Sequence, residues 1–148
     1  MKIKVSNVNQ TAWKECNVHA TLPAELSKLQ ELAYNLWWSW NGEAKDLFRY
    51  IDIEAWHRAG SNPVLLLNTI SYDRMVQLSK DKKFMKQLNA VYADFRAYMD
   101  TPKDKNKPTV AYFSMEYGLS HVLRIYSGGL GILPGHCNKA ASDCNVDL

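Results

Sequence analysis

The chain has 148 residues, of which 47% are hydrophobic and 22% charged, and its formal net charge at pH 7 is +3. This is an ordinary globular composition, which argues against wholesale disorder. No run of Lys and Arg interleaved with aromatic residues is present, so a nucleic-acid-binding footprint is missing, and no apolar stretch approaches the ~20 residues of a membrane span.

The cysteines, Cys16, Cys137 and Cys144, are odd in number, and no secretory leader precedes them. This pattern argues against a disulfide scaffold and favours a reducing compartment, so we expect a soluble cytoplasmic protein. Cys137, Cys144 and the neighbouring His136 form only a loose group, whereas structural zinc usually needs two close ligand pairs. We therefore expect no metal site.

Two short segments at the start of the chain alternate imperfectly between apolar and polar residues. They are Lys2 to Val8 and Trp13 to Thr21, on either side of Asn9-Gln10. Alternation with period two is typical of strands, so the sequence predicts a short N-terminal β-hairpin.

From Pro23 the apolar spacing changes to three and four residues, which is typical of a helix with a buried stripe. The pattern predicts one helix from Pro23, in its first turn, to a stop at Asn41-Gly42. Two adjacent tryptophans cannot both face one core, so at least one of Trp37 and Trp38 should pack against another element. Core packing is a better explanation of these rings, and of Trp40, than stacking on sugars.

Four further helices are expected before residue 100, each preceded by a side chain that can cap it. The caps are Asp52 before residues 53–59, Asn62 (with Pro63 in the first turn) before residues 64–70, Ser71 before a helix to about residue 80, and Asp81 before the longest pattern. Residues 1–100 are therefore interpreted as an N-terminal, α-rich helical domain.

Residues 101–108 contain two prolines, four charged residues and no large apolar side chain, and are interpreted as a linker. Thr109 to Met115 is almost continuously apolar and predicts a central strand of a parallel sheet. A helix from Ile132 to Ser142 follows, and the final "NVDL" resembles the start of another strand. Residues 109–148 are thus predicted to be the first β-α portion of a Rossmann-like α/β domain, truncated.

The strongest local signal is Gly128-Gly129-Leu130-Gly131 in the turn that begins at Ser127, between the predicted strand and helix. Glycines allow backbone N–H groups to face a concavity, and a helix N-terminus adds partial positive charge. Phosphate is the natural guest of such a site, although a merely tight, mobile turn explains the same residues. The turn does not complete the dinucleotide-binding pattern Gly-x-Gly-x-x-Gly, because Pro134 stands where the third glycine is needed.

Polar residues around this turn are weaker candidates. Glu116 lies just past the strand end, where open α/β sheets place functional groups, and Tyr126 could stack on a sugar. Arg124 could meet an anion, although a surface ion pair is the commoner fate. His121 lies between the strand and the turn. His136 is more often structural than catalytic, because no nucleophile or carboxylate partner is identifiable.

Five motifs together give a specific resemblance. In order and spacing, "LPAELSKLQELAYNLWWSWN", "NPVLLLNTIS", "VAYFSMEYGL", "IYSGGLGIL" and "KAASD" are similar to the α-glucan (glycogen/maltodextrin) phosphorylases, in their bacterial branch with an extra N-terminal helical region. The resemblance covers nearly the whole chain and implies an N-terminal fragment of such a glycosyltransferase.

The resemblance implies that the whole enzyme uses inorganic phosphate to cleave terminal α-1,4 bonds of a glucan, giving glucose 1-phosphate. It also implies pyridoxal 5′-phosphate as cofactor, whose Schiff-base lysine lies far downstream and is not Lys139. Gly128 to Gly131 would then line the substrate and phosphate site, with Gly129 donating its N–H to phosphate and Leu130 touching glucose. The chain alone should be inactive, with no catalytic residue of its own, and the full-length protein could form a homo-oligomer.

The chain departs from the family just after the turn, where relatives read Ala-Gly-Asp-(His or Tyr)-Leu-Lys. Here His136 replaces the acidic residue, Asn138 replaces the apolar one, and Pro134 enters the helix start. Two alternatives remain. A glycogen or starch synthase has a similar turn, but usually has Lys at the position of Tyr126. A non-catalytic module could instead use residues 1–100 for regulation, dimerisation or glucan tethering.

Overall fold

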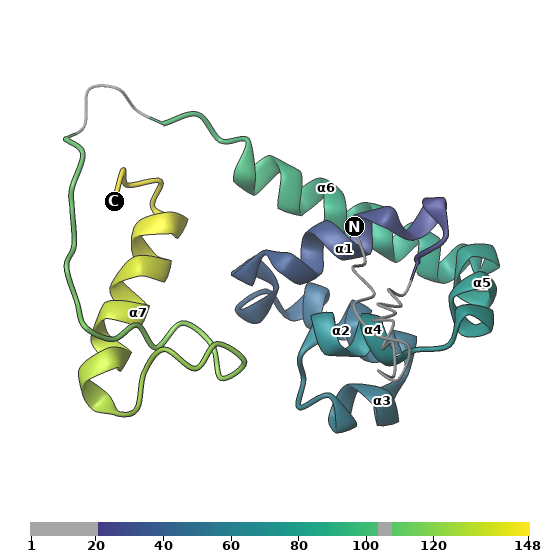
Figure 1. Ribbon diagram of the computed structural model, residues 1–148. Helices are drawn as coiled ribbons and strands as arrows, with labels where there is room; N and C mark the ends of the chain where they lie inside the picture. Colours follow the sequence, from purple (N-terminus) through teal and green to yellow (C-terminus); the bar gives the residue numbers. More distant parts are fainter. Residues whose placement is uncertain (1–20, 104–107) are drawn as a thin grey trace, which may run out of the picture.

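The computed structural model describes residues 21–103 and 108–148 (Figure 1). The segments expected to form a β-hairpin, residues 2–8 and 13–21, lie outside the described residues except for Thr21, which is in no strand. None of the helices in the described ranges is long and apolar enough to cross a membrane.

The first described part of the chain, residues 21–103, is helical. Its elements are η1 (Ala24–Leu26), α1 (Ser27–Tyr34), η2 (Leu36–Ser39), α2 (Gly42–Ile51), α3 (Ile53–Arg58), α4 (Pro63–Thr69), α5 (Tyr72–Lys80) and α6 (Lys82–Met99). We call these elements the helical bundle. They confirm the helical part of the fold expected from the sequence.

The four predicted caps are all present. The Asp52 carboxylate accepts a hydrogen bond from the Ala55 N–H at 2.8 Å, and the Asn62 side chain accepts one from Val64 at 3.0 Å. The remaining caps are Ser71, which accepts from the Arg74 N–H, and Asp81, which accepts from the Lys83 and Phe84 N–H groups. Each cap satisfies a backbone donor that the first helical turn leaves unpaired, so these helices begin where the sequence predicts.

The prediction of a single helix between Pro23 and Asn41 is wrong, because this range contains η1, α1 and η2. The chain breaks at Asn35, whose backbone is extended, with φ −105° and ψ 125°, and whose side chain accepts from the Trp37 N–H at 2.9 Å. Asparagine competes in this way with helical hydrogen bonds. Asn41-Gly42, which was expected only to end a helix, also begins the next one. The Asn41 side chain caps α2, and Gly42 is the first residue of α2.

The break at Asn35 allows both adjacent tryptophans to enter the core. Trp37 is only 5% exposed and lies 5.5 Å, centroid to centroid, from Phe95 of α6. Trp38 is 2% exposed and lies edge-on to Trp56 of α3 at 6.1 Å. The two rings thus face different elements, and their burial confirms that they serve core packing.

The predicted α/β unit is wrong for the described residues, because residues 21–103 and 108–148 contain no strand. Thr109–Met115 is extended but unpaired, and Phe113 and Met115 are 92% and 94% exposed. Its one backbone bond to the chain end joins the Val110 N–H to the Asp147 carbonyl at 2.7 Å. A strand needs a ladder of such bonds to a neighbour, and the described chain supplies only this one.

The helix of this region, α7 (Gly129–Asp143), begins at Gly129 instead of Ile132 and contains Pro134 in its interior. In Figure 1 it lies beside the helical bundle, and a loop of residues 119–124 reaches from its side toward the bundle. That loop contacts the bundle through His121, whose Nε2 lies 3.0 Å from the Gly60 carbonyl oxygen, and through the half-buried Val122. At the other end of α7, the Tyr98 hydroxyl contacts Ser142 and Asp143.

Candidate functional site

The glycine turn is held at the base of the 119–124 loop. The Tyr117 N–H donates to the Ile125 carbonyl at 3.2 Å and closes the loop, which brings Glu116 beside Ser127. Gly128 then takes the N-cap position of α7 with an extended backbone, and Gly129 is the first helical residue. Residues on either side of the loop are thereby assembled at one helix N-terminus.

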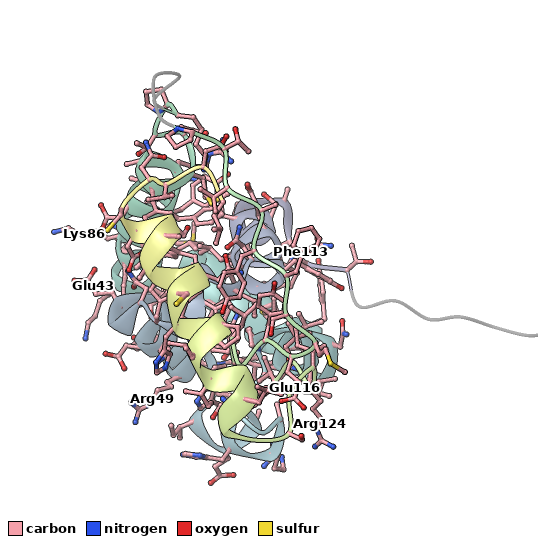
Figure 2. The ribbon with its side chains drawn as sticks, turned by 90° about the vertical axis from the view of Figure 1, so that its left-hand side faces the viewer. Glu43, Arg49, Lys86, Phe113, Glu116 and Arg124 are labelled. Carbon is pink, nitrogen blue, oxygen red and sulfur yellow. The ribbon has the colours of Figure 1, made fainter. Side chains whose placement is uncertain are left out.

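The carboxylate of Glu116 binds the residue that precedes the glycines. Its Oε1 accepts from the Ser127 hydroxyl at 2.9 Å, and its Oε2 accepts from the Ser127 N–H at 3.3 Å. A carboxylate at a helix N-terminus is stabilised by the partial positive charge there. Figure 2 shows Glu116 close to the first turn of α7, with Arg124 nearby.

Two of the glycines are required because the chain approaches itself closely. The Gly118 N–H donates to the Gly131 carbonyl at 2.7 Å. A Cβ at Gly131 would lie 2.6 Å from the Tyr126 Cβ, and one at Gly135 would lie 2.3 Å from the Gly118 carbonyl oxygen. These distances are far inside van der Waals contact, so any side chain there would push the 116–118 segment away from α7.

The other two glycines leave space instead. A Cβ at Gly128 or Gly129 would meet nothing within 4 Å, and the Leu130 side chain is 72% exposed. In the described part of the chain, no acceptor contacts the backbone N–H groups of Gly128, Gly129 or Leu130. Open donors at a helix N-terminus can bind an anion, although the charge of Glu116 opposes one.

The structure therefore brings together the predicted residues Gly128 to Gly131, Glu116 and Tyr126. Arg124 lies nearby, whereas the two histidine candidates lie elsewhere. His121 contacts Gly60 in the helical bundle, and His136 is exposed farther along α7. Cys137 and Cys144 are free thiols, and no group of metal-binding side chains is present within the described ranges.

Sequence reasoning missed Gly118, and it placed Ser127 in the turn without pairing it with Glu116. Gly118 is buried and packs against both Gly131 and Gly135, and Ser127 provides the two donors that hold Glu116. A single glycine far from the turn carries no local signal of this contact. Ser127 belongs to the predicted turn, but its contact with Glu116 depends on the closure of the loop between them.

Comparison with known proteins identifies relatives along most of the chain. Residues 22–123 match the family described as "Protein of unknown function (DUF3417)". Glycogen phosphorylase from Mycobacterium tuberculosis (strain ATCC 25618 / H37Rv) is 39% identical over 149 aligned residues, covering 93% of this chain but 17% of the relative. No solved structure matches the chain.

Two other relatives also match most of this chain but only a small part of their own length. Maltodextrin phosphorylase from Thermococcus litoralis is 44% identical over 88% of this chain and 16% of its own length. Glycogen phosphorylase from Aquifex aeolicus is 42% identical over 81% of this chain and 18% of its own length. The chain therefore spans less than a fifth of each of these relatives, and the match lies in their N-terminal part.

Proposed function

Because this chain belongs to the DUF3417 family and is homologous to glycogen and maltodextrin phosphorylases, we propose that it is the N-terminal part of an α-glucan phosphorylase. The whole protein would transfer a glucosyl unit from the end of an α-1,4-glucan to inorganic phosphate and release glucose 1-phosphate. Residues 1–100 would form its N-terminal helical domain, residues 101–108 a linker, and residues 109–148 the start of the next domain. This enzyme would be cytoplasmic and could form a homo-oligomer.

The observation that carries the proposal is the glycine turn with its open donors. Gly131 and Gly135 pack against the 116–118 segment, and this leaves the N–H groups of Gly128, Gly129 and Leu130 without acceptors in the described chain. Donors that are fixed before the reaction stabilise developing negative charge without a cost of reorganisation. We propose that Gly129 donates to phosphate and that the exposed Leu130 touches the glucosyl ring.

Exposed apolar side chains also support a larger protein. Phe113, Met115 and Leu133 stand largely in solvent on the extended segment and on α7. Phe113 and Met115 lie together with Tyr112 and Tyr117 around one shallow surface hollow, and exposed apolar patches usually mark an interface. Further protein packed on this side would bury them, in agreement with the much greater length of the relatives.

The described residues do not form a site for pyridoxal 5′-phosphate. Lys139, the lysine of α7, places its Nζ 5.7 Å from the centroid of the Trp40 ring, on the side of the helical bundle. It does not belong to the glycine turn, where the cofactor phosphate would be needed. If the whole protein uses this cofactor, as the resemblance implies, another part of it must hold the reactive lysine.

The alternatives find less support. Tyr126 stands where a glycogen or starch synthase usually has lysine. A glucan-tethering module would need exposed aromatic surfaces. Trp37, Trp38 and Trp56 do not provide one, because they are buried in the bundle core, and Tyr34 and Tyr72 are the most exposed aromatic residues of the described bundle.

A phosphorolysis assay tests the proposal. The 148-residue chain, and the proposed longer protein that begins with it, would each be incubated with maltoheptaose and inorganic phosphate. The glucose 1-phosphate formed would then be measured. We expect product from the full-length protein and none from the chain alone. Glucosyl transfer from a nucleotide sugar, with no phosphorolysis, would instead assign the protein to the synthases.

A further inference from the structure

A cavity lies where the 119–124 loop meets the helical bundle. It is a groove of about 530 Å³ between α2, α3 and the loop. Lys45, Asp46 and Arg49 of α2, His57 of α3 and His121 of the loop supply its polar lining. Small-molecule sites typically have volumes of about 300–1,000 Å³ and a few convergent polar groups, so its size and lining suit a ligand.

Positive charge in this groove is not balanced by the described residues. Arg49 contacts Asp46 at 3.3 Å, but no carboxylate in the described chain forms an ion pair with the half-buried Lys45. Burial, and next the charge of Lys45, lower the pKa of Lys139 of α7, which itself does not line the groove. A bound anion would relieve the repulsion between Lys45 and Lys139.

The same groove also offers hydrogen-bond acceptors. The Gly60 carbonyl can only accept, so the bond of 3.0 Å to His121 requires a proton on Nε2. In neutral imidazole this leaves the His121 Nδ1 as an acceptor. The carboxylate of Asp46, which is exposed, has further lone pairs besides those facing Arg49. Such acceptors suit the hydroxyl groups of a ligand.

Aromatic stacking contributes little here. Trp38 and Trp56 line the groove, but both are buried and present only a small part of their rings. A flat base or an extended glucan would find no platform, whereas a compact polar ligand needs none.

We propose that the groove between α2, α3 and the 119–124 loop binds a phosphorylated sugar, with its phosphate on Lys45 and Arg49 and its hydroxyl groups on Asp46 and His121. Lysine and arginine are the side chains that bind phosphate esters through charge-assisted hydrogen bonds. Because His121 belongs to the loop that ends at the glycine turn, an occupied groove would also tie this loop to the helical bundle.

This site shares no residue with the glycine turn and does not depend on the proposed phosphorylase activity. Residue-resolved NMR separates the two, because the amides of Lys45, Arg49 and His57 report on the groove and those of Gly128 and Gly129 report on the turn. The 148-residue chain would be titrated with glucose 6-phosphate, inorganic phosphate and glucose at constant ionic strength.

We expect glucose 6-phosphate to shift the groove resonances at lower concentration than phosphate, and glucose to leave them unchanged. The double variant Lys45→Gln, Arg49→Gln should weaken binding by about tenfold or more, because charged hydrogen bonds are lost. Lys86→Gln is the control, since Lys86 is an exposed lysine of α6 outside the groove, and Figure 2 shows it well separated from Arg49.

Unchanged affinity in the double variant would overturn the proposal, as would shifts confined to the glycine turn. Equal responses to glucose and glucose 6-phosphate would also overturn it, because the phosphate would then play no part. If the double variant loses the dispersed spectrum of a folded protein, Lys45→Gln alone is used, with an expected loss of about threefold or more.

Discussion

Glu116 and Ser127 are joined by two hydrogen bonds, from the Ser127 hydroxyl at 2.9 Å and from its backbone N–H at 3.3 Å. The Glu116 carboxylate therefore already accepts hydrogen bonds from Ser127, the first residue of the turn for which the sequence predicts phosphate binding. An incoming anion must either share this helix N-terminus with Glu116 or displace its side chain.

Neutralising this carboxylate should strengthen anion binding at the turn. In Glu116→Gln the amide oxygen can still accept from Ser127, but a negative charge beside the open N–H groups is removed. Two like charges a few ångströms apart in water repel by about 1 kcal/mol, so we expect phosphate to bind about fivefold more tightly. The shifts of the Gly128 and Gly129 amides on phosphate titration measure this.

Glu43→Gln is the matched control for this change, because Glu43 is an exposed residue of α2 that Figure 2 shows away from Glu116. It removes the same charge at a distance and should leave the affinity unchanged. Weaker binding in Glu116→Gln would mean that the carboxylate serves mainly to position the turn.

Two glycines of one helical turn should respond oppositely to alanine. Gly131→Ala places a Cβ 2.6 Å from the Tyr126 Cβ, and we expect a loss of about 1–3 kcal/mol in the free energy that holds α7 against the 116–118 segment. Gly129→Ala meets nothing within 4 Å and should stabilise α7 by about 0.5–1 kcal/mol. Hydrogen exchange of the α7 amides compares them, and equal protection in the two variants would contradict the packing argument.

The cap of α6 should contribute to stability in a pH-dependent way. Hydrogen bonds from the Phe84 N–H, and also from the Tyr50 hydroxyl and the Lys83 N–H, hold the pKa of Asp81 below its ordinary value of 3.8. A carboxyl group whose pKa falls on folding stabilises the folded state above its unfolded pKa, and this contribution is lost as the pH falls through the folded pKa. The difference in Tm between the native chain and Asp81→Ala should therefore be full at pH 7 and shrink below about pH 4.

Asp73→Ala serves as the comparison for the cap. Asp73 is an exposed acidic residue in the first turn of α5, and its side chain forms no hydrogen bond with the described residues. Thermal unfolding followed by circular dichroism between pH 2.5 and 7 should show a smaller and flatter effect for it. A difference for Asp81→Ala that persists at the lowest pH would contradict the role of the charged cap.

The contact between η2 and α6 should dominate the stability of the helical bundle. Phe95 is 2% exposed and packs against Trp37 at 5.5 Å between ring centroids. Phe95→Ala should lower the free energy of unfolding by about 3–5 kcal/mol, because it removes a buried ring and leaves a cavity. Urea denaturation measures this.

Met99→Ala is the counterpart on the same helix, because Met99 is 47% exposed. It should change the free energy of unfolding by no more than about 0.5 kcal/mol. A soluble glucan should also leave the tryptophan fluorescence of the native chain unchanged. Quenching of that fluorescence would support the alternative that residues 1–100 bind a glucan.

Local signals were sufficient for most of the bundle. The caps Asp52, Asn62, Ser71 and Asp81 were predicted correctly because a cap depends on residues only two or three positions away. The break at Asn35 was missed, since its apolar neighbours continue the helical spacing, whereas the Asn35 cap and the burial of two adjacent tryptophans together favour the break. For the site, the glycines of the turn were recognised, but not the distant Gly118 against which two glycines pack.

The sequence by itself determined where α3 to α6 begin, which of their faces are buried, and that a cluster of glycines lies at the start of the last helix. These features follow from spacing and from hydrogen bonds within one helical turn. Only the tertiary structure decided that Thr109–Met115 forms no strand in the described chain, because a strand exists only through bonds to a neighbour. It also decided that Glu116 meets Ser127 and that Gly118 meets Gly131 and Gly135, since these contacts depend on how the 119–124 loop closes and docks on the bundle.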